Sequence, residues 1–146
     1  MLVDSAVYIN GVRSHEVEPG SGFTWVGLLD PSTDEIENYR QKFSLHPLAV
    51  EDAVMGRQRP KLDVYPRHSF LILKTVMFDT GTSRIVVGDI GIFINEKFIV
   101  IVRHGDAIPM RSIRADLERH PDRLKEGSTA VLHEVLDRLV DQYVDV

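Results

Sequence analysis

The fold is decided by SFLILKTVMF at residues 69–78, IVVGDIGIFI at 85–94 and FIVIV at 98–102. All three runs are rich in β-branched and aromatic residues, which favour strands. Each run is also much shorter than the about 20 apolar residues that a membrane-spanning helix requires. Turn-forming residues at 79–81 and 95–97 separate them. We therefore expect three consecutive antiparallel strands joined by tight turns.

Shorter strands are expected earlier in the chain, over residues 6–12, 23–29 and 61–64. The first of them ends near Asn10-Gly11, a dipeptide that is typical of hairpin turns.

Two helices are expected between these early strands. Ser32 and Glu35 have the spacing of a capping box, in which each side chain bonds the other's backbone amide, so a helix should begin there. A second helix is expected over 47–54, because Pro47 is favoured in a first turn, where its missing amide proton costs nothing. Gly56 is a natural end for it.

The last third of the sequence returns to helical patterns. An amphipathic helix is expected over 107–120 and should end at Pro121, and Ser128 can cap a final helix. We therefore predict an α/β fold: an α/β/α layered domain with a mixed parallel and antiparallel sheet, ending in the start of a long helix. The α/β domain should cover 1–126, and the long helix should begin within 127–146. Because this helix meets no stop signal, we expect the natural protein to continue beyond it.

Composition narrows the class of protein. The formal net charge is −5 and the chain has no cysteine. The acidic balance argues against a nucleic-acid partner, which would need clustered positive charge. The missing cysteines exclude disulfides, thiolate nucleophiles and cysteine-ligated zinc. The N-terminus lacks the pattern of a secretory signal, so we expect a soluble, cytoplasmic polypeptide.

An enzyme is not expected. No histidines have the spacing H-x-x-x-H or H-E-x-x-H, and no serine lies in a G-x-S-x-G elbow. We find no pairing of a nucleophile with a base.

Glu51 and Asp52 are adjacent in the second expected helix. Neighbouring helix positions diverge by about 100°, so the two side chains would touch one cation only at its edge, or two cations side by side. Magnesium usually takes only one or two protein carboxylates and keeps several waters. From the residues alone, a solvated helix face is the more ordinary interpretation. The basic group Arg57, Arg59 and Lys61 follows, and we expect it to be solvated or paired with Asp63 and Glu51.

The final helix carries a second acidic feature. Asp137, Asp141 and Asp145 recur every four residues, and His133 lies one turn before them. Like charges at this spacing destabilise an isolated helix by about 0.2–0.5 kcal/mol per pair. We expect a positive charge to offset this repulsion, either a metal ion or basic side chains. Arg123 and Arg138 are available for that role.

Several stretches closely resemble the cytosolic domain of the CorA family, and together they cover most of the chain in the family's order. They are LHPLAVED at 45–52, RQRPKL at 57–62, FLIL at 70–73, FIVIVRHG at 98–105 and LDRLVDQY at 136–143.

This resemblance implies a homopentameric magnesium channel with a funnel-shaped cytoplasmic α/β/α domain. The domain would lie at the cytoplasmic face of the cell membrane. Each subunit would cross the membrane through C-terminal helices that lie outside this sequence. Divalent cations, Mg²⁺ or Co²⁺, would bind between neighbouring subunits and hold the pore closed. The carboxylates that match the family's ligands are Glu51, Asp52 and Asp137. A further aspartate, expected farther along the long helix of the adjacent subunit, has no counterpart here.

Two alternatives stay open. Within the same superfamily the transported ion could be zinc, cobalt or nickel, since selectivity belongs to the pore. The other alternative is a stand-alone soluble metal-binding regulatory domain. Two spans of about 20 apolar residues downstream would support the transporter.

Overall fold

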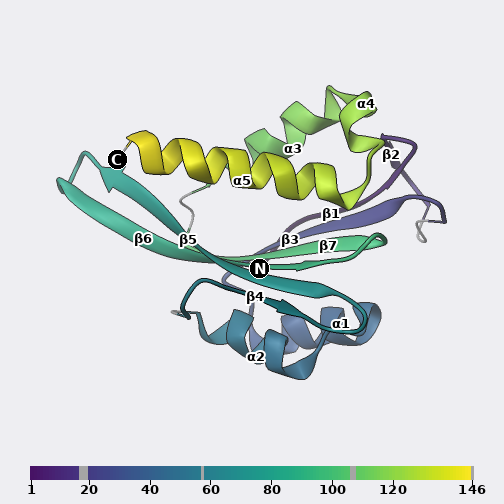
Figure 1. The fold of residues 1–146 in the computed structure, drawn as a ribbon, viewed down its shortest axis with the longest axis horizontal. Coiled ribbons are helices and arrows are strands. Elements are labelled where there is room, and N and C mark those ends of the chain that lie inside the picture. The colour runs from purple at the N-terminus through teal and green to yellow at the C-terminus, as the bar shows by residue number, and fades with distance from the viewer. Residues whose placement is uncertain (17–19, 57, 106–107, 146) are drawn as a thin grey trace.

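The structure is a computed structural model that describes residues 1–16, 20–56, 58–105 and 108–145. Its centre is a seven-stranded sheet with the order β2-β1-β3-β7-β6-β5-β4 (Figure 1). The strands are β1 (Leu2–Ile9), β2 (Val12–Ser14), β3 (Phe23–Leu29), β4 (Lys61–Val64), β5 (Ser69–Asp79), β6 (Arg84–Ile94) and β7 (Phe98–His104).

The sheet is mixed, as predicted. Strands β3 and β7 pair in parallel, whereas the other neighbouring strands of the described residues pair antiparallel. The expected three-stranded array is β5–β6–β7. Its register aligns Phe70 with Phe93 and Phe93 with Val100.

Helices cover both faces of the sheet (Figure 1). On one face lie α1 (Thr33–Phe43) and α2 (Pro47–Met55). On the other lie α3 (Met110–Glu118), α4 (Pro121–Leu124) and α5 (Ser128–Asp145). The α/β/α layering is thus confirmed. Within the described ranges, no helix combines the length and the apolar character needed to cross a membrane.

Strand β7 shows why the apolar runs are continuous rather than alternating. Ile99 and Ile101 belong to the core cluster beneath α3 and α5. Val100 and Val102 belong to the cluster beneath α1 and α2. Because both faces of this strand are buried, every position from Phe98 to Val102 is apolar.

The predicted helix boundaries hold on the α1–α2 face. Ser32 and Glu35 form the capping box, and Pro47 occupies the first turn of α2. Gly56 ends α2 with a φ of 62°, a conformation that glycine adopts without steric cost.

The first strand was predicted wrongly. It runs from Leu2 to Ile9, and Asn10-Gly11 turns the chain into the additional strand β2. Both turn residues have positive φ, which is the geometry of a tight hairpin turn. A Cβ on Gly11 would lie 2.1 Å from the carbonyl oxygen of Pro121, so this turn also packs against α4.

Helix α3 begins at Met110 rather than at residue 107, which itself lies outside the described residues. Pro109 explains the late start, since a proline disfavours helical geometry in the residue before it. Pro121 follows the end of α3, as expected, but it also opens the short helix α4, which was not predicted.

The final helix begins at Ser128 itself. The predicted capping role is not what its side chain does, because the hydroxyl donates a hydrogen bond to the carbonyl of Asn95 over 2.6 Å. This bond ties α5 to the β6–β7 turn.

Candidate metal site

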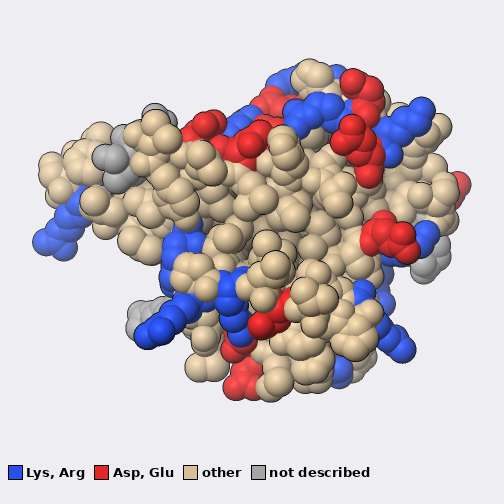
Figure 2. All heavy atoms as spheres, viewed as in Figure 1, with Lys and Arg blue, Asp and Glu red and all other residues tan. Residues whose placement is uncertain are grey.

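The predicted ligands Glu51 and Asp52 both lie in the second turn of α2, on the same side of the sheet as α1. Glu51 is exposed and Asp52 is half-buried. Figure 2 shows acidic and basic side chains next to each other in the lower part of the view, where α2 and β4 lie.

Asp52 is paired with a lysine of the neighbouring edge strand. The ammonium Nζ of Lys61 on β4 lies 2.5 Å from Oδ2 of Asp52 and 3.0 Å from Oδ2 of Asp63. The hydrogen bonds to Asp52 and Asp63 raise the pKa of Lys61, so it stays charged. The predicted pairing of this basic group with Asp63 is confirmed for Lys61, but its second partner is Asp52 and not Glu51. Arg57 lies outside the described residues.

Glu51 has different surroundings. Its side chain makes no hydrogen bond or ion pair with any other described residue. It lines a groove of about 360 Å³ between α1 and α2, whose apolar lining includes Ile36, Val50 and Val54. On the same helix, Leu48 and Met55 are 60% and 64% exposed. Within the described part of the chain, Glu51 is therefore an unpaired carboxylate on a helix that also exposes the apolar side chains Leu48 and Met55.

Asp137, the third predicted ligand, lies on α5 on the opposite face of the sheet (Figure 1). Its side chain is 60% exposed, and Oδ2 lies 3.7 Å from Nδ1 of His133. The structure thus places Glu51 and Asp52 on one helix with different surroundings, and the sheet separates both from Asp137. Across the described ranges, no three His, Asp or Glu side chains gather closely enough to hold an ion.

The arginines expected to offset the acidic stripe have other partners. Arg138 pairs with Asp116 at 2.5 Å and with Glu134, and Arg123 also pairs with Glu134. Asp141 has no partner among the described residues. The side chain of Asp145 lies outside them. Among the described residues, the exposed carboxylates of α5 therefore have only His133 as a basic partner, and any other positive charge must come from outside the chain.

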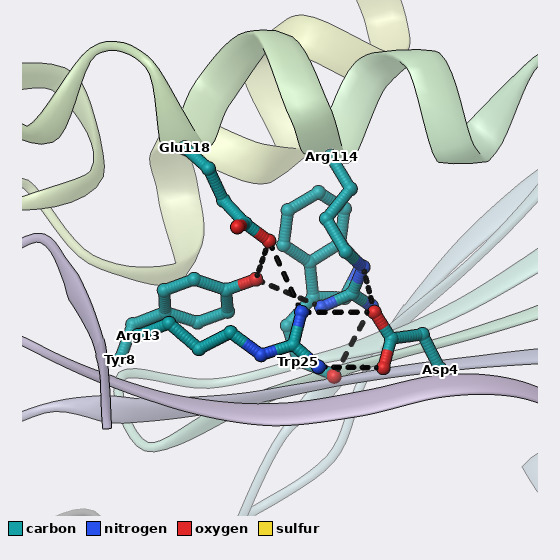
Figure 3. Close-up of polar contacts among 6 residues, drawn as sticks. All are labelled: Asp4, Tyr8, Arg13, Trp25, Arg114 and Glu118. Carbon is teal, nitrogen blue, oxygen red and sulfur yellow. Dashed lines mark hydrogen bonds and ion pairs between the residues drawn. The ribbon is translucent and has the colours of Figure 1, made fainter. Parts of the chain in front are cut away.

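A second polar cluster, not foreseen from the sequence, joins α3 to the first three strands (Figure 3). Arg114 is buried and stacks on the ring of Trp25 at 3.9 Å. It donates to the hydroxyl of Tyr8 over 3.0 Å and forms an ion pair with Asp4 at 3.2 Å. Tyr8 in turn donates to Glu118 over 2.9 Å.

The charges of this cluster balance. Arg13 bridges Asp4 and Glu118, at 2.9 and 3.2 Å, so two guanidinium groups face two carboxylates. Burial raises the pKa of Tyr8 to about 12. Burial would also raise the pKa of Asp4, but the hydrogen bond from Arg13 and the charge of Arg114 outweigh it and lower that pKa. With its charges paired, this cluster is structural rather than a metal site.

The sequence did contain a signal for Arg114. Met110, Ile113 and Leu117 are the apolar positions of α3, and Arg114 occupies the remaining position of the same i, i+3, i+4, i+7 stripe. An arginine in that position must find buried partners.

Solved structures of a CorA domain and a ZntB domain have the same fold. The soluble domain of CorA from Methanocaldococcus jannaschii matches 91% of this chain, which covers 53% of that structure, with a TM-score of 0.68 at 16% identity. The cytoplasmic domain of ZntB from Vibrio parahaemolyticus matches 99% of the chain, which covers 61% of that structure, with a TM-score of 0.71 at 16% identity. At this identity the likeness shows the fold.

The family follows from the sequence match. Residues 20–146 match the family described as CorA-like Mg2+ transporter protein, and the chain belongs to this family. It is 32% identical over 126 residues to the putative metal ion transporter YfjQ of Bacillus subtilis, covering 86% of this chain and 38% of that protein. It is 24% identical over 123 residues to the cobalt/magnesium transport protein CorA of Thermotoga maritima, covering 82% of this chain and 35% of that protein. The chain thus spans well under half the length of these relatives.

Proposed function

We propose that this chain is the cytoplasmic, divalent-cation-sensing domain of a metal-ion transporter anchored in the cell membrane by segments outside this sequence. Mg²⁺ bound between neighbouring copies at Glu51, Asp52 and Asp137 favours the closed state. The observation that carries the proposal is the setting of Glu51, an unpaired carboxylate beside an apolar groove in a chain of this family.

The separation of the ligands supports a site between copies. One chain carries Glu51 and Asp52 on one face and Asp137 on the other. When two different faces of identical subunits meet, the interface is head-to-tail, and such interfaces form a ring when the rotation between subunits closes. The expected homopentamer is one such ring. The exposed Leu48 and Met55 then become buried beside the ligands.

The switch is electrostatic. Two carboxylates about 5 Å apart across a subunit boundary repel by about 3 kcal/mol at an effective dielectric near 20. A bound cation reverses the sign and favours the packed ring. The ion shifts the equilibrium only by its difference in affinity between the closed and open states. In a ring with several such sites, the free-energy differences of the individual sites add up. When cytosolic Mg²⁺ falls, the sites empty and the ring loosens.

Lys61 refines this scheme. In the metal-free chain it neutralises Asp52, so an arriving cation competes with an ammonium group for that carboxylate. Glu51 has no such competitor among the described residues and is the natural first contact. Magnesium needs only one or two carboxylates beside its waters, so the two residues suffice on this side of the boundary.

Zinc or cobalt is the second candidate as regulating and transported ion. It is favoured by the relative from Thermotoga maritima that is named for both cobalt and magnesium. The three ligands proposed here are carboxylates, and hard oxygen ligands suit Mg²⁺ better than Zn²⁺.

Thermal melting of the full-length protein in rising Mg²⁺ tests the proposal, with Zn²⁺ and Co²⁺ as parallel titrations. We expect Mg²⁺ to raise the melting temperature of the wild type and not that of a Glu51→Ala/Asp52→Ala/Asp137→Ala variant. Asp122→Ala, an exposed carboxylate on α4, is the matched control and should respond like the wild type. Equal Mg²⁺ stabilisation of the wild type and the triple variant would remove these residues from the site.

A further inference from the structure

A cavity separate from the carboxylates lies where the end of α1, the start of α2 and the β4–β5 turn meet. Its volume is about 390 Å³, within the about 300–1,000 Å³ range of small-molecule sites. Leu45, Pro47, Tyr65 and Pro66 supply apolar surface. The stacked rings of His46 and Tyr65, 4.1 Å apart, hold this wall in place.

The charge of the lining distinguishes this cavity from the other hollows. Arg40 and Arg67 line it, and its described lining includes no Asp or Glu. The groove beside Glu51 also contains Glu37, and the cavity beside Arg114 contains Asp4 and Glu118. Arg40 shares its charge with Glu37 outside this lining, whereas Arg67 pairs with no described carboxylate, so the positive charge available to an anion here is mainly that of Arg67.

Hydrogen-bond donors are left over on the same wall. The amide of Leu48 donates to Nδ1 of His46, so the proton of the neutral ring is on Nε2, and this N–H has no partner among the described residues. Arg40 uses Nε and Nη2 to bind Glu37, which leaves Nη1 without a partner in the described part of the chain. The side chain of Arg67 pairs with no described residue. All of these groups donate, and none accepts.

His68 closes the back of the cavity. Its Nε2 accepts from the backbone amide of His46 over 2.9 Å, so its Nδ1–H donates to the carbonyl of Ser69. Both of its ring nitrogens are therefore used within the fold. The ring anchors the start of α2 and leaves ligand binding to its neighbours.

We propose that this cavity binds a small organic anion, in which a phosphate or carboxylate group faces Arg40, Arg67 and His46 while an apolar body lies on Leu45, Pro47 and Pro66. Guanidinium groups suit both kinds of anion because their fork of donors matches the oxygens of either group. The site is independent of the carboxylates proposed to sense metal.

Amide-resolved NMR titration of the 146-residue chain tests the proposal with four probes. Phenyl phosphate and benzoate combine an anionic group with a ring, phenol has the ring alone, and inorganic phosphate has the anion alone. We expect saturable shifts confined to residues 40–47 and 65–68 with phenyl phosphate, benzoate or both. Phenol and inorganic phosphate should bind at least about tenfold more weakly, since each lacks half of the contacts. The stronger of the first two probes identifies the anionic group.

Variants separate this site from general attraction of anions. Arg67→Ala should weaken binding about tenfold or more, since a hydrogen bond to a charged group contributes about 1.5 kcal/mol or more and about 1.4 kcal/mol is a tenfold change in affinity. His46→Asn keeps an acceptor that can cap α2 but removes the Nε2–H, and should also weaken binding. Arg59→Ala, an exposed arginine outside the cavity, should bind like the wild type. Equal affinity of Arg67→Ala and Arg59→Ala, or shifts that do not saturate or lie elsewhere, would overturn the proposal.

Discussion

Single residues carry the least expected features of this domain. Arg114 is 6% exposed, yet its charge is held by Asp4, by the hydroxyl of Tyr8 and by the face of Trp25. Removing one partner of a buried ion pair leaves the other partner without compensation, which costs more than the pair contributes.

Replacing Arg114 by leucine should therefore destabilise the fold by about 2–4 kcal/mol, less than a fully buried pair because Asp4 keeps Arg13. Urea unfolding measures the free energy. Arg111→Leu, an exposed position on the same helix, is the control and should change stability by less than about 0.5 kcal/mol. Equal losses in the two variants would show that the buried pair contributes nothing.

His68 makes stability depend on pH. Burial lowers its pKa from the usual 6.5, and its Nε2 must stay unprotonated to accept from His46. The unfolded chain takes up the proton first as pH falls, so it binds more protons than the folded state between the folded pKa and 6.5. Stability contributed by this residue is complete above 6.5 and is lost as pH falls through that window.

The measurement is the unfolding free energy between about pH 5 and pH 7.5, around the usual histidine pKa. His68→Gln keeps an acceptor but does not titrate, so its stability should fall less steeply towards acid than that of the wild type. His15→Gln, at an exposed position, should follow the wild type. Identical slopes for His68→Gln and the wild type would refute this role.

At the scale of elements, sequence patterns predicted what local chemistry dictates. The capping box of α1, the proline start and glycine end of α2 and the β5–β7 array were all predictable, because each depends on residues close together in the chain. The short elements β2 and α4 were missed, since three or four residues are too few to show a period.

Pairing between elements was harder to predict. Lys61 reaches back nine positions to Asp52 because β4 lies beside α2. No periodicity of either segment indicates that contact. The pairing of Lys61 with Asp63 is easier to predict, because the two residues lie two positions apart on one face of the same strand.

The link between α2 and β4 should set the sensitivity of the proposed sensor. Lys61→Met in the full-length protein removes the competitor for Asp52 and should tighten Mg²⁺ binding about two- to fivefold, since exposed ion pairs contribute up to about 1 kcal/mol. Isothermal titration with Mg²⁺ measures the change, and Lys125→Met, another exposed lysine, is the control. Unchanged or weaker binding in Lys61→Met would contradict competition at Asp52.

At the scale of the whole molecule, the decisive fact is the sheet that separates α2 from α5. The family match was enough to choose Glu51, Asp52 and Asp137 from the sequence. Their distribution over two faces of the sheet could not be predicted, since it depends on how the chain between the parallel strands β3 and β7 is arranged. If the three carboxylates bind one ion, as proposed, that distribution requires a site between neighbouring copies and not within one chain.

The central claim is that cations at these carboxylates close a transporter. Mg²⁺ flux through the full-length protein in liposomes, recorded while Mg²⁺ on the cytoplasmic side is raised, tests it most directly. Wild-type flux should fall steeply as that concentration rises, while Glu51→Ala/Asp52→Ala/Asp137→Ala should keep conducting. Closure of both proteins at the same Mg²⁺ concentration would contradict the account.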